Sequence, residues 1–206
     1  MEKTVSKTTT VGIVIKDHVI LAADKRATAG PMVYHKAVKK IAKITDYSAL
    51  TITGLVADAQ FLIENARYFA KLYELRTLKP ISLRSLATRL ALILSIYLRQ
   101  APFIVQLLLG GHDLGGPALY YIDLYGTIST EKYMATGSGS PLAFGVLESE
   151  YREDMSVQDA VNLAFKAIAT ALLRDGYSGE GVDIVVIGPG IYEEKTIPIK
   201  RTPVSS

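Results

Sequence analysis

The chain of 206 residues contains no cysteine. This absence excludes disulfide bonds, thiolate nucleophiles and thiolate metal sites, and it fits a reducing cytoplasm. Apolar runs are short as well, since the longest, Leu90–Leu98, falls well below the roughly 20 residues that span a bilayer. The first seven residues lack the apolar core of a secretory signal. We therefore expect a cytoplasmic protein that neither enters nor binds a membrane.

Metal-binding and nucleic-acid-binding patterns are also scarce. None of the three histidines has a second histidine or a carboxylate at ligand spacing, so we expect no metal site and no cofactor. A serine triad lacks support because no G-x-S-x-G segment occurs. GSGS at 137–140 lacks the lysine of a phosphate-binding loop and predicts a tight turn before a helix. The net charge of +3 comes from scattered basic residues, so no nucleic acid is expected as a partner.

Short apolar and β-branched runs predict strands that come in pairs. The first two, 8–15 and 18–24, are separated by two residues and predict a hairpin. Further strands are expected at 40–44, 49–54, 103–110, 118–124, 133–137, 182–188 and 192–199. Helical periodicity appears at 58–75, with Asp58 as a plausible cap, at 82–99, from 140 onward and from 156 to 174. Strands in hairpins with helices in pairs favour a single α+β domain, a four-layer α-β-β-α sandwich of two largely antiparallel sheets.

Three consecutive threonines, Thr8 to Thr10, begin the first predicted strand after only seven residues. A threonine hydroxyl is a good nucleophile when the residue is N-terminal, because its own α-amine, with a pKa near 8, can accept the proton. Asp24 ends the second strand, and a lysine on the third strand would lie close to Thr8 if those strands are adjacent. The alternative is structural: β-branched threonine suits strands, and Asp24 with Lys40 would be an ordinary ion pair.

Six ordered segments between residue 8 and about residue 188 closely resemble proteasome β subunits, most like those of archaea. They are TTTVGIVIKDHVILAADKRAT, HKAVKKI, TITGLVADAQ, QLLLGG, TGSGSPLAFGVLESEY and RDGYSGEGVDIVVI. Bacterial ATP-dependent relatives share the threonine start, but GVLESEY and RDGYSGEG resemble the proteasome itself. The resemblance implies the fold of N-terminal nucleophile hydrolases and a threonine endopeptidase. It also implies a heptameric ring with other β subunits, stacking on α subunits, and an ATPase regulator that delivers unfolded proteins.

The same resemblance implies the functional residues. Thr8 matches the nucleophile, and Gly54 matches the residue whose backbone N–H stabilises the oxyanion. The supporting catalytic residues would be Asp24, Lys40, Ser138, Asp175 and Ser178. An apolar substrate pocket, favouring cleavage after hydrophobic residues, would be formed by Ala27, Val38, Ala42, Ile52 and Val56. Each single position also has a structural alternative: the two serines would cap turns, Asp175 would form an ion pair at a helix end, and Gly54 would be needed only for its backbone conformation.

Lys7 departs from the family pattern, which has glycine before the nucleophile. Self-cleavage requires the threonine hydroxyl to attack the preceding carbonyl from a tight turn, and lysine adds a Cβ there. The main hypothesis is an active endopeptidase in which residues 1–7 are a propeptide, cleaved between Lys7 and Thr8, and 8–206 form the domain. The alternative is a non-catalytic or unprocessed ring or assembly subunit. An unrelated amidase on the same fold is disfavoured by the match along the whole chain.

Overall fold

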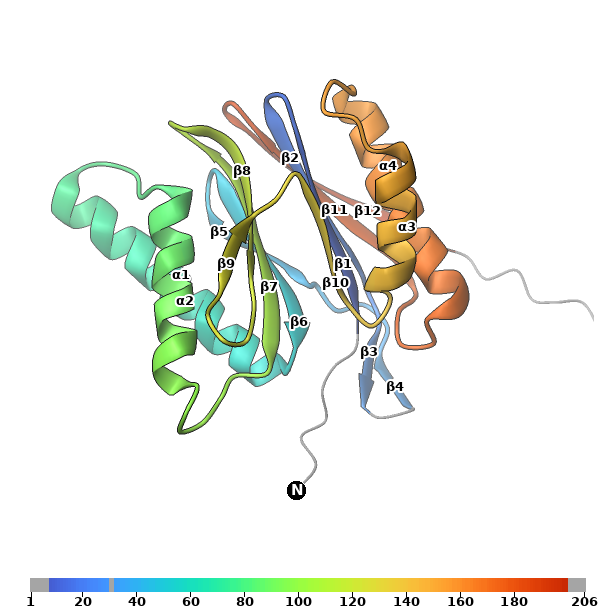
Figure 1. Cartoon of the computed structure of the whole chain (residues 1–206), viewed down its shortest axis with the longest axis horizontal. Coiled ribbons are helices and arrows are strands. Elements are labelled where there is room, and N and C mark those ends of the chain that lie inside the picture. The colour runs from blue at the N-terminus through green and yellow to red at the C-terminus, as the bar shows by residue number, and fades with distance from the viewer. Residues whose placement is uncertain (1–7, 30–31, 200–206) are drawn as a thin grey trace, which may run out of the picture.

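The computed structural model describes residues 8–29 and 32–199, and Figure 1 shows two stacked β-sheets between two pairs of helices. The predicted propeptide, including Lys7, lies outside the described residues. The first sheet has the order β10-β1-β2-β11-β12, with all neighbours antiparallel. Its strands are β1 (Thr9–Ile15), β2 (His18–Asp24), β10 (Tyr133–Gly137), β11 (Gly181–Gly188) and β12 (Ile191–Pro198).

The second sheet has the order β5-β6-β7-β8-β9 and is antiparallel throughout. Its strands are β5 (Ile41–Thr45), β6 (Ser48–Gly54), β7 (Val105–Asp113), β8 (Gly116–Ile122) and β9 (Ile128–Thr130). A separate ribbon pairs β3 (Ala27–Ala29) with β4 (Met32–His35). The helices are α1 (Val56–Thr77), α2 (Leu83–Tyr97), α3 (Ser140–Glu150) and α4 (Val157–Arg174). None of these described helices is long and apolar enough to cross a membrane.

Strand β2 illustrates how the layers pack. Its sequence HVILAAD is a nearly continuous apolar run because both of its faces are buried. Val19 and Leu21 pack against the second sheet, where they meet Leu108 and other apolar side chains. Ile20 and Ala22 point the other way, into the cluster formed with α3 and α4. The second sheet is covered in the same manner by α1 and α2, as Figure 1 shows.

The predicted four-layer α+β sandwich is confirmed, with most predicted strands and helices within a few residues of the observed bounds. The ribbon strands β3 and β4 and the short β9 were not predicted, because they are brief and because every residue of β4 is exposed. The prediction that Asp58 caps its helix was wrong. α1 begins at Val56 after Leu55, and the Asp58 carboxylate instead accepts a hydrogen bond of 2.8 Å from the Ile104 N–H.

Candidate active site

Thr8, Asp24 and Lys40 converge at one end of the two sheets. The hairpin register pairs Thr10 with Ala23, which brings the head of β1 beside the end of β2. The Thr8 hydroxyl donates to Asp24 Oδ1 and accepts from Lys40 Nζ, and Lys40 Nζ lies 2.8 Å from Asp24 Oδ1. All three residues are buried, with exposed fractions of 1% for Thr8, 0% for Asp24 and 4% for Lys40. A hydroxyl, a carboxylate and an amine therefore share one water-poor site.

The expectation that Lys40 lies on a strand adjacent to β2 was wrong. Lys40 immediately precedes β5, which belongs to the second sheet. Its carbonyl accepts a hydrogen bond of 2.8 Å from the Ile52 N–H, which places its backbone alongside β6. The amine therefore reaches Asp24 across the space between the sheets, and stacking of the layers creates the site.

The Asp24 carboxylate is held by three backbone donors. Oδ1 accepts from the Thr9 N–H at 3.0 Å, and Oδ2 accepts from the N–H groups of Arg26 at 3.0 Å and Gly179 at 2.9 Å. These bonds compensate the cost of burying the charge. Burial lowers the pKa of Lys40, while the attraction of Asp24 opposes that shift. The Lys40 amine can therefore release a proton at a lower pH than a solvated lysine.

A second polar group is centred on Asp175, the residue that follows α4, and contacts the head of β1 through two serines. Asp175 Oδ2 accepts hydrogen bonds of 2.7 Å from both Ser138 and Ser178. The Ser138 hydroxyl is also 3.4 Å from the Thr8 carbonyl oxygen, and the Ser178 hydroxyl is 2.8 Å from the Thr9 hydroxyl. The structure thus brings together all six residues that the resemblance assigned to catalysis, in two connected groups.

Two glycines lie next to the site in backbone conformations that side chains rarely adopt. Gly54 has φ +113°, and a Cβ there would lie 2.0 Å from the Ile104 carbonyl oxygen. Gly137 has φ +91°, and a Cβ there would lie 1.9 Å from the Thr8 carbonyl oxygen. Gly137 was noticed in the sequence only as part of a glycine-rich turn. Its α-carbon is in fact packed directly against the nucleophile candidate.

The five residues proposed for the substrate pocket come from neighbouring segments. Ala42 on β5 and Ile52 on β6 pack against the cluster under α1 and α2. The Val38 N–H donates a hydrogen bond of 3.0 Å to the carbonyl of Lys25, and Lys25 lies two residues before Ala27 in the sequence. Val56 begins α1 and is 44% exposed, and the other four are partly buried. Each therefore retains some surface that a ligand can contact.

Arg26 is a site neighbour that sequence reasoning missed. Its buried guanidinium donates to Glu180 Oε1 at 2.7 and 3.2 Å and to the Gly176 carbonyl at 2.9 Å. These bonds attach the segment that carries Asp175 and Ser178 to the end of β2. The available signals were the R of AADKR and the E of RDGYSGEG, both within segments that carry the resemblance.

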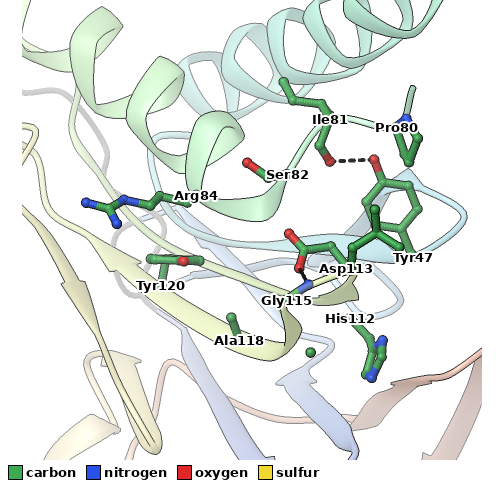
Figure 2. Close-up of a pocket in the computed structure, with 12 residues that line it drawn as sticks. Tyr47, Pro80, Ile81, Ser82, Arg84, His112, Asp113, Gly115, Ala118 and Tyr120 are labelled. Carbon is green, nitrogen blue, oxygen red and sulfur yellow. Dashed lines mark hydrogen bonds between the residues drawn. The ribbon is translucent and has the colours of Figure 1, made fainter. Parts of the chain in front are cut away.

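A cavity of about 600 Å³ opens at the other end of the second sheet, near Asp113 at the end of β7. Figure 2 shows side chains that line it. Asp113, which lines it, accepts hydrogen bonds of 2.7 Å from the backbone N–H groups of Leu83 and Gly115. The Tyr47 hydroxyl donates to the Ile81 carbonyl at 2.7 Å. Within residues 8–29 and 32–199, no group of three or more histidine, aspartate or glutamate side chains is arranged to hold a metal. The cavity is large enough for a ligand, but both oxygens of its Asp113 carboxylate already accept backbone hydrogen bonds.

Two stacked sheets between helical layers, with threonine at the head of β1, are the architecture of the N-terminal nucleophile hydrolases. A family model described as proteasome subunit matches residues 5–187. Proteasome subunit beta 2 of Desulfurococcus amylolyticus is 68% identical over 206 residues, covering all of both chains. Its namesake in Staphylothermus marinus is 63% identical, covering 98% of this chain and 97% of the relative. Proteasome subunit beta of Methanocaldococcus vulcanius is 48% identical, covering 89% and 83%. The chain belongs to the proteasome subunit family, and the predicted resemblance to archaeal β subunits is confirmed.

Proposed function

We propose that this β subunit is a threonine endopeptidase of the 20S core whose nucleophile is Thr8 after removal of residues 1–7. The observation that carries the proposal is the buried contact of the Thr8 hydroxyl with Lys40 and Asp24. The particle would contain a heptameric ring with other β subunits, α subunits, and an ATPase regulator that supplies unfolded proteins. It would work in the cytoplasm without a cofactor.

In the mature form, the free α-amine of Thr8 accepts the proton of Oγ1 as the oxygen attacks the substrate carbonyl carbon. The Gly54 N–H stabilises the resulting oxyanion. Collapse of this intermediate breaks the peptide bond, the protonated amine of Thr8 gives its proton to the leaving amine, and an ester remains on Thr8. Water then hydrolyses the ester, which restores the hydroxyl and releases the second product.

Lys40 and Asp24 adjust the pKa of the base in this scheme, which is the α-amine of Thr8. A positive charge on Lys40 disfavours the protonated α-amine and so lowers its pKa. Asp24, 2.8 Å away, keeps the ammonium paired and in place. Ser138, Asp175 and Ser178 orient the terminal threonine and the hydrolytic water. Ala27, Val38, Ala42, Ile52 and Val56 would bind an apolar side chain before the cleaved bond.

Maturation needs a different base, because the nitrogen of Thr8 is an amide while the Lys7–Thr8 bond is intact. Lys40 Nζ contacts the Thr8 hydroxyl, and burial lowers its pKa, so we propose that Lys40 accepts the proton during self-cleavage. The Thr8 oxygen then attacks the Lys7 carbonyl carbon, and the Lys7–Thr8 C–N bond breaks as Lys40 gives the proton to the leaving nitrogen of Thr8. Water hydrolyses the resulting ester, which releases residues 1–7 and restores the Thr8 hydroxyl. The Cβ of Lys7 should make this step slower than with glycine.

The test combines intact mass with peptide hydrolysis, using the chain assembled with its α subunits. We expect the wild type to lose residues 1–7 and to cleave peptides after hydrophobic residues. Thr8→Ala should keep its leader and lose hydrolysis by about a thousandfold or more. Lys7→Gly is the matched control and should mature faster. A full-length mass with no hydrolysis, even in Lys7→Gly, would make the chain a non-catalytic ring subunit.

A further inference from the structure

Four threonine hydroxyls form a buried chain of hydrogen bonds between the two sheets. The Thr136 hydroxyl of β10 is 2.7 Å from both Thr10 of β1 and Thr53 of β6. The Thr10 hydroxyl is also 3.2 Å from that of Thr51, which accepts from the Leu108 N–H at 3.2 Å. None of the four threonines is more than 6% exposed. We call this set, Thr10, Thr51, Thr53 and Thr136, the threonine chain.

The threonine chain differs from the rest of the contact between the sheets. Away from the candidate active site much of that contact is apolar, with Val19 and Leu21 in one buried cluster with Leu108 and Leu119. Apolar contacts depend on buried area and tolerate small shifts, whereas hydrogen bonds require a definite distance and angle. A buried hydroxyl that loses its partner also carries a desolvation cost. The threonine chain therefore restricts how β1 and β10 can move relative to β6.

Each strand in this connection ends at the proposed active site. Thr10 lies two residues after Thr8 on the same chain segment, and Thr53 immediately precedes Gly54. Thr136 immediately precedes Gly137, whose α-carbon is packed against the Thr8 carbonyl. The register of β1 and β10 pairs Thr10 directly with Thr136. The hydroxyls thus link the segment of the nucleophile to the segment of the proposed oxyanion donor.

We propose that Thr10, Thr53 and Thr136 are positioning residues, which hold Thr8 at the distance from Gly54 that peptide hydrolysis requires. The inference rests on the proposed function and extends it to residues that touch neither substrate nor proton. Displacement of a reacting group by about 1 Å can reduce a rate by about 100-fold. Loss of one hydroxyl should therefore lower turnover and leave substrate binding nearly unchanged.

The experiment uses Thr10→Val and Thr136→Val in the assembled particle, because valine keeps the shape and removes the hydroxyl. We expect kcat to fall by about tenfold to 100-fold with KM changed by less than about twofold. Thr10→Ser restores the hydroxyl and should recover most of kcat. The matched control is Thr45→Val, because Thr45 makes a 2.7 Å hydroxyl pair with Ser48 in the second sheet, at the end away from Gly54. This control should keep the wild-type kcat.

Amide hydrogen exchange supplies a second measurement that does not depend on catalysis. Thr10→Val should speed exchange in segments around Thr9 and Gly54 by about tenfold more than Thr45→Val does. Unchanged kcat and unchanged exchange in both valine variants would overturn the inference, as would an equal loss in Thr45→Val. If the wild type cleaves nothing, the proposed function fails, and the exchange result alone decides whether the hydroxyls hold the two strands together.

Discussion

Asp24 and Asp113 are each the last residue of a strand, at opposite ends of the sandwich, and both accept backbone hydrogen bonds. The two carboxylate oxygens of Asp113 each accept one hydrogen bond, from the backbone N–H of Leu83 or Gly115, beside a cavity of about 600 Å³. Asp24 has the same backbone role but is completely buried and also contacts an amine and a hydroxyl. The comparison shows that reactive side chains in mutual contact, and not the volume of a cavity, identify the candidate active site.

Asp24→Asn should give the largest effect. The amide has one acceptor oxygen, so its NH₂ would face either Lys40 or a backbone N–H, and the buried ammonium would lose its charge partner. Breaking a buried ion pair costs about 3–5 kcal/mol, and hydrolysis should fall by about 100-fold or more as Thr8 and Lys40 shift. Urea unfolding and peptide hydrolysis measure the two losses.

The matched control for that change is Asp183→Asn. Asp183 on β11 forms a 2.8 Å ion pair with Lys25, the residue after β2, and is not one of the residues hydrogen-bonded to Thr8 in the described part of the chain. The control should lose stability and keep the wild-type hydrolysis rate in the assembled particle. Equal loss of hydrolysis in both variants would mean that Asp24 acts only through general stability, and the comparison with Asp113 would fail.

Lys40→Met should change how stability depends on pH. Burial lowers the pKa of Lys40 in the folded chain below its ordinary 10.5, so between the two values the unfolded chain holds a proton that the folded chain lacks. This contribution is fully present above pH 10.5 and is lost as the pH falls toward the lowered pKa. Its slope is at most about 1.4 kcal/mol per pH unit.

Thermal unfolding of the wild type and of Lys40→Met across alkaline pH measures that slope, as the difference between the free energies of unfolding of the two chains at each pH. The free energy of unfolding of the wild type should rise with pH relative to the variant, because all other titrating groups are common to both. Parallel curves would show that Lys40 keeps an ordinary pKa, and its proposed part in maturation would then lose its physical basis.

Asp113→Asn should give the smallest effect. Asparagine keeps one acceptor for the backbone donors of Leu83 and Gly115, so we expect a loss of about 1 kcal/mol in the free energy of unfolding. Peptide hydrolysis should remain at the wild-type rate. A fall in hydrolysis comparable to that of Asp24→Asn would place the cavity of Figure 2 in the active site and reverse the comparison.

Local signals predicted much of the fold. The two-residue turn between Ile15 and His18 and the helical periodicity at 82–99 and 156–174 each depend on residues close together in sequence. Asp58 does not cap α1 because its carboxylate accepts a hydrogen bond from the Ile104 N–H, which lies far along the chain. Short or exposed strands such as β4 and β9 carry too few apolar residues for periodicity to identify them.

The residues of the candidate site also differ in whether nearby sequence or distant segments decide their position. Thr8 and Asp24 lie at the ends of strands joined by a hairpin, so their proximity follows from local pairing. Lys40 reaches them from the opposite sheet, which no spacing along the chain indicates. Arg26 and the hydroxyl partners of Thr10 were missed for the same reason, since their partners come from distant segments.

The sequence by itself determined the layered α+β class, the family and the identity of the residues that can carry chemistry. Periodicity, turn residues and ordered motifs are properties of the chain alone. Only the tertiary structure decided that an amine from one sheet meets a hydroxyl and a carboxylate from the other, and that four threonines connect the strands beneath them. Packing of the two sheets is the physical reason, because it buries these polar groups together and leaves each with the others as its partners.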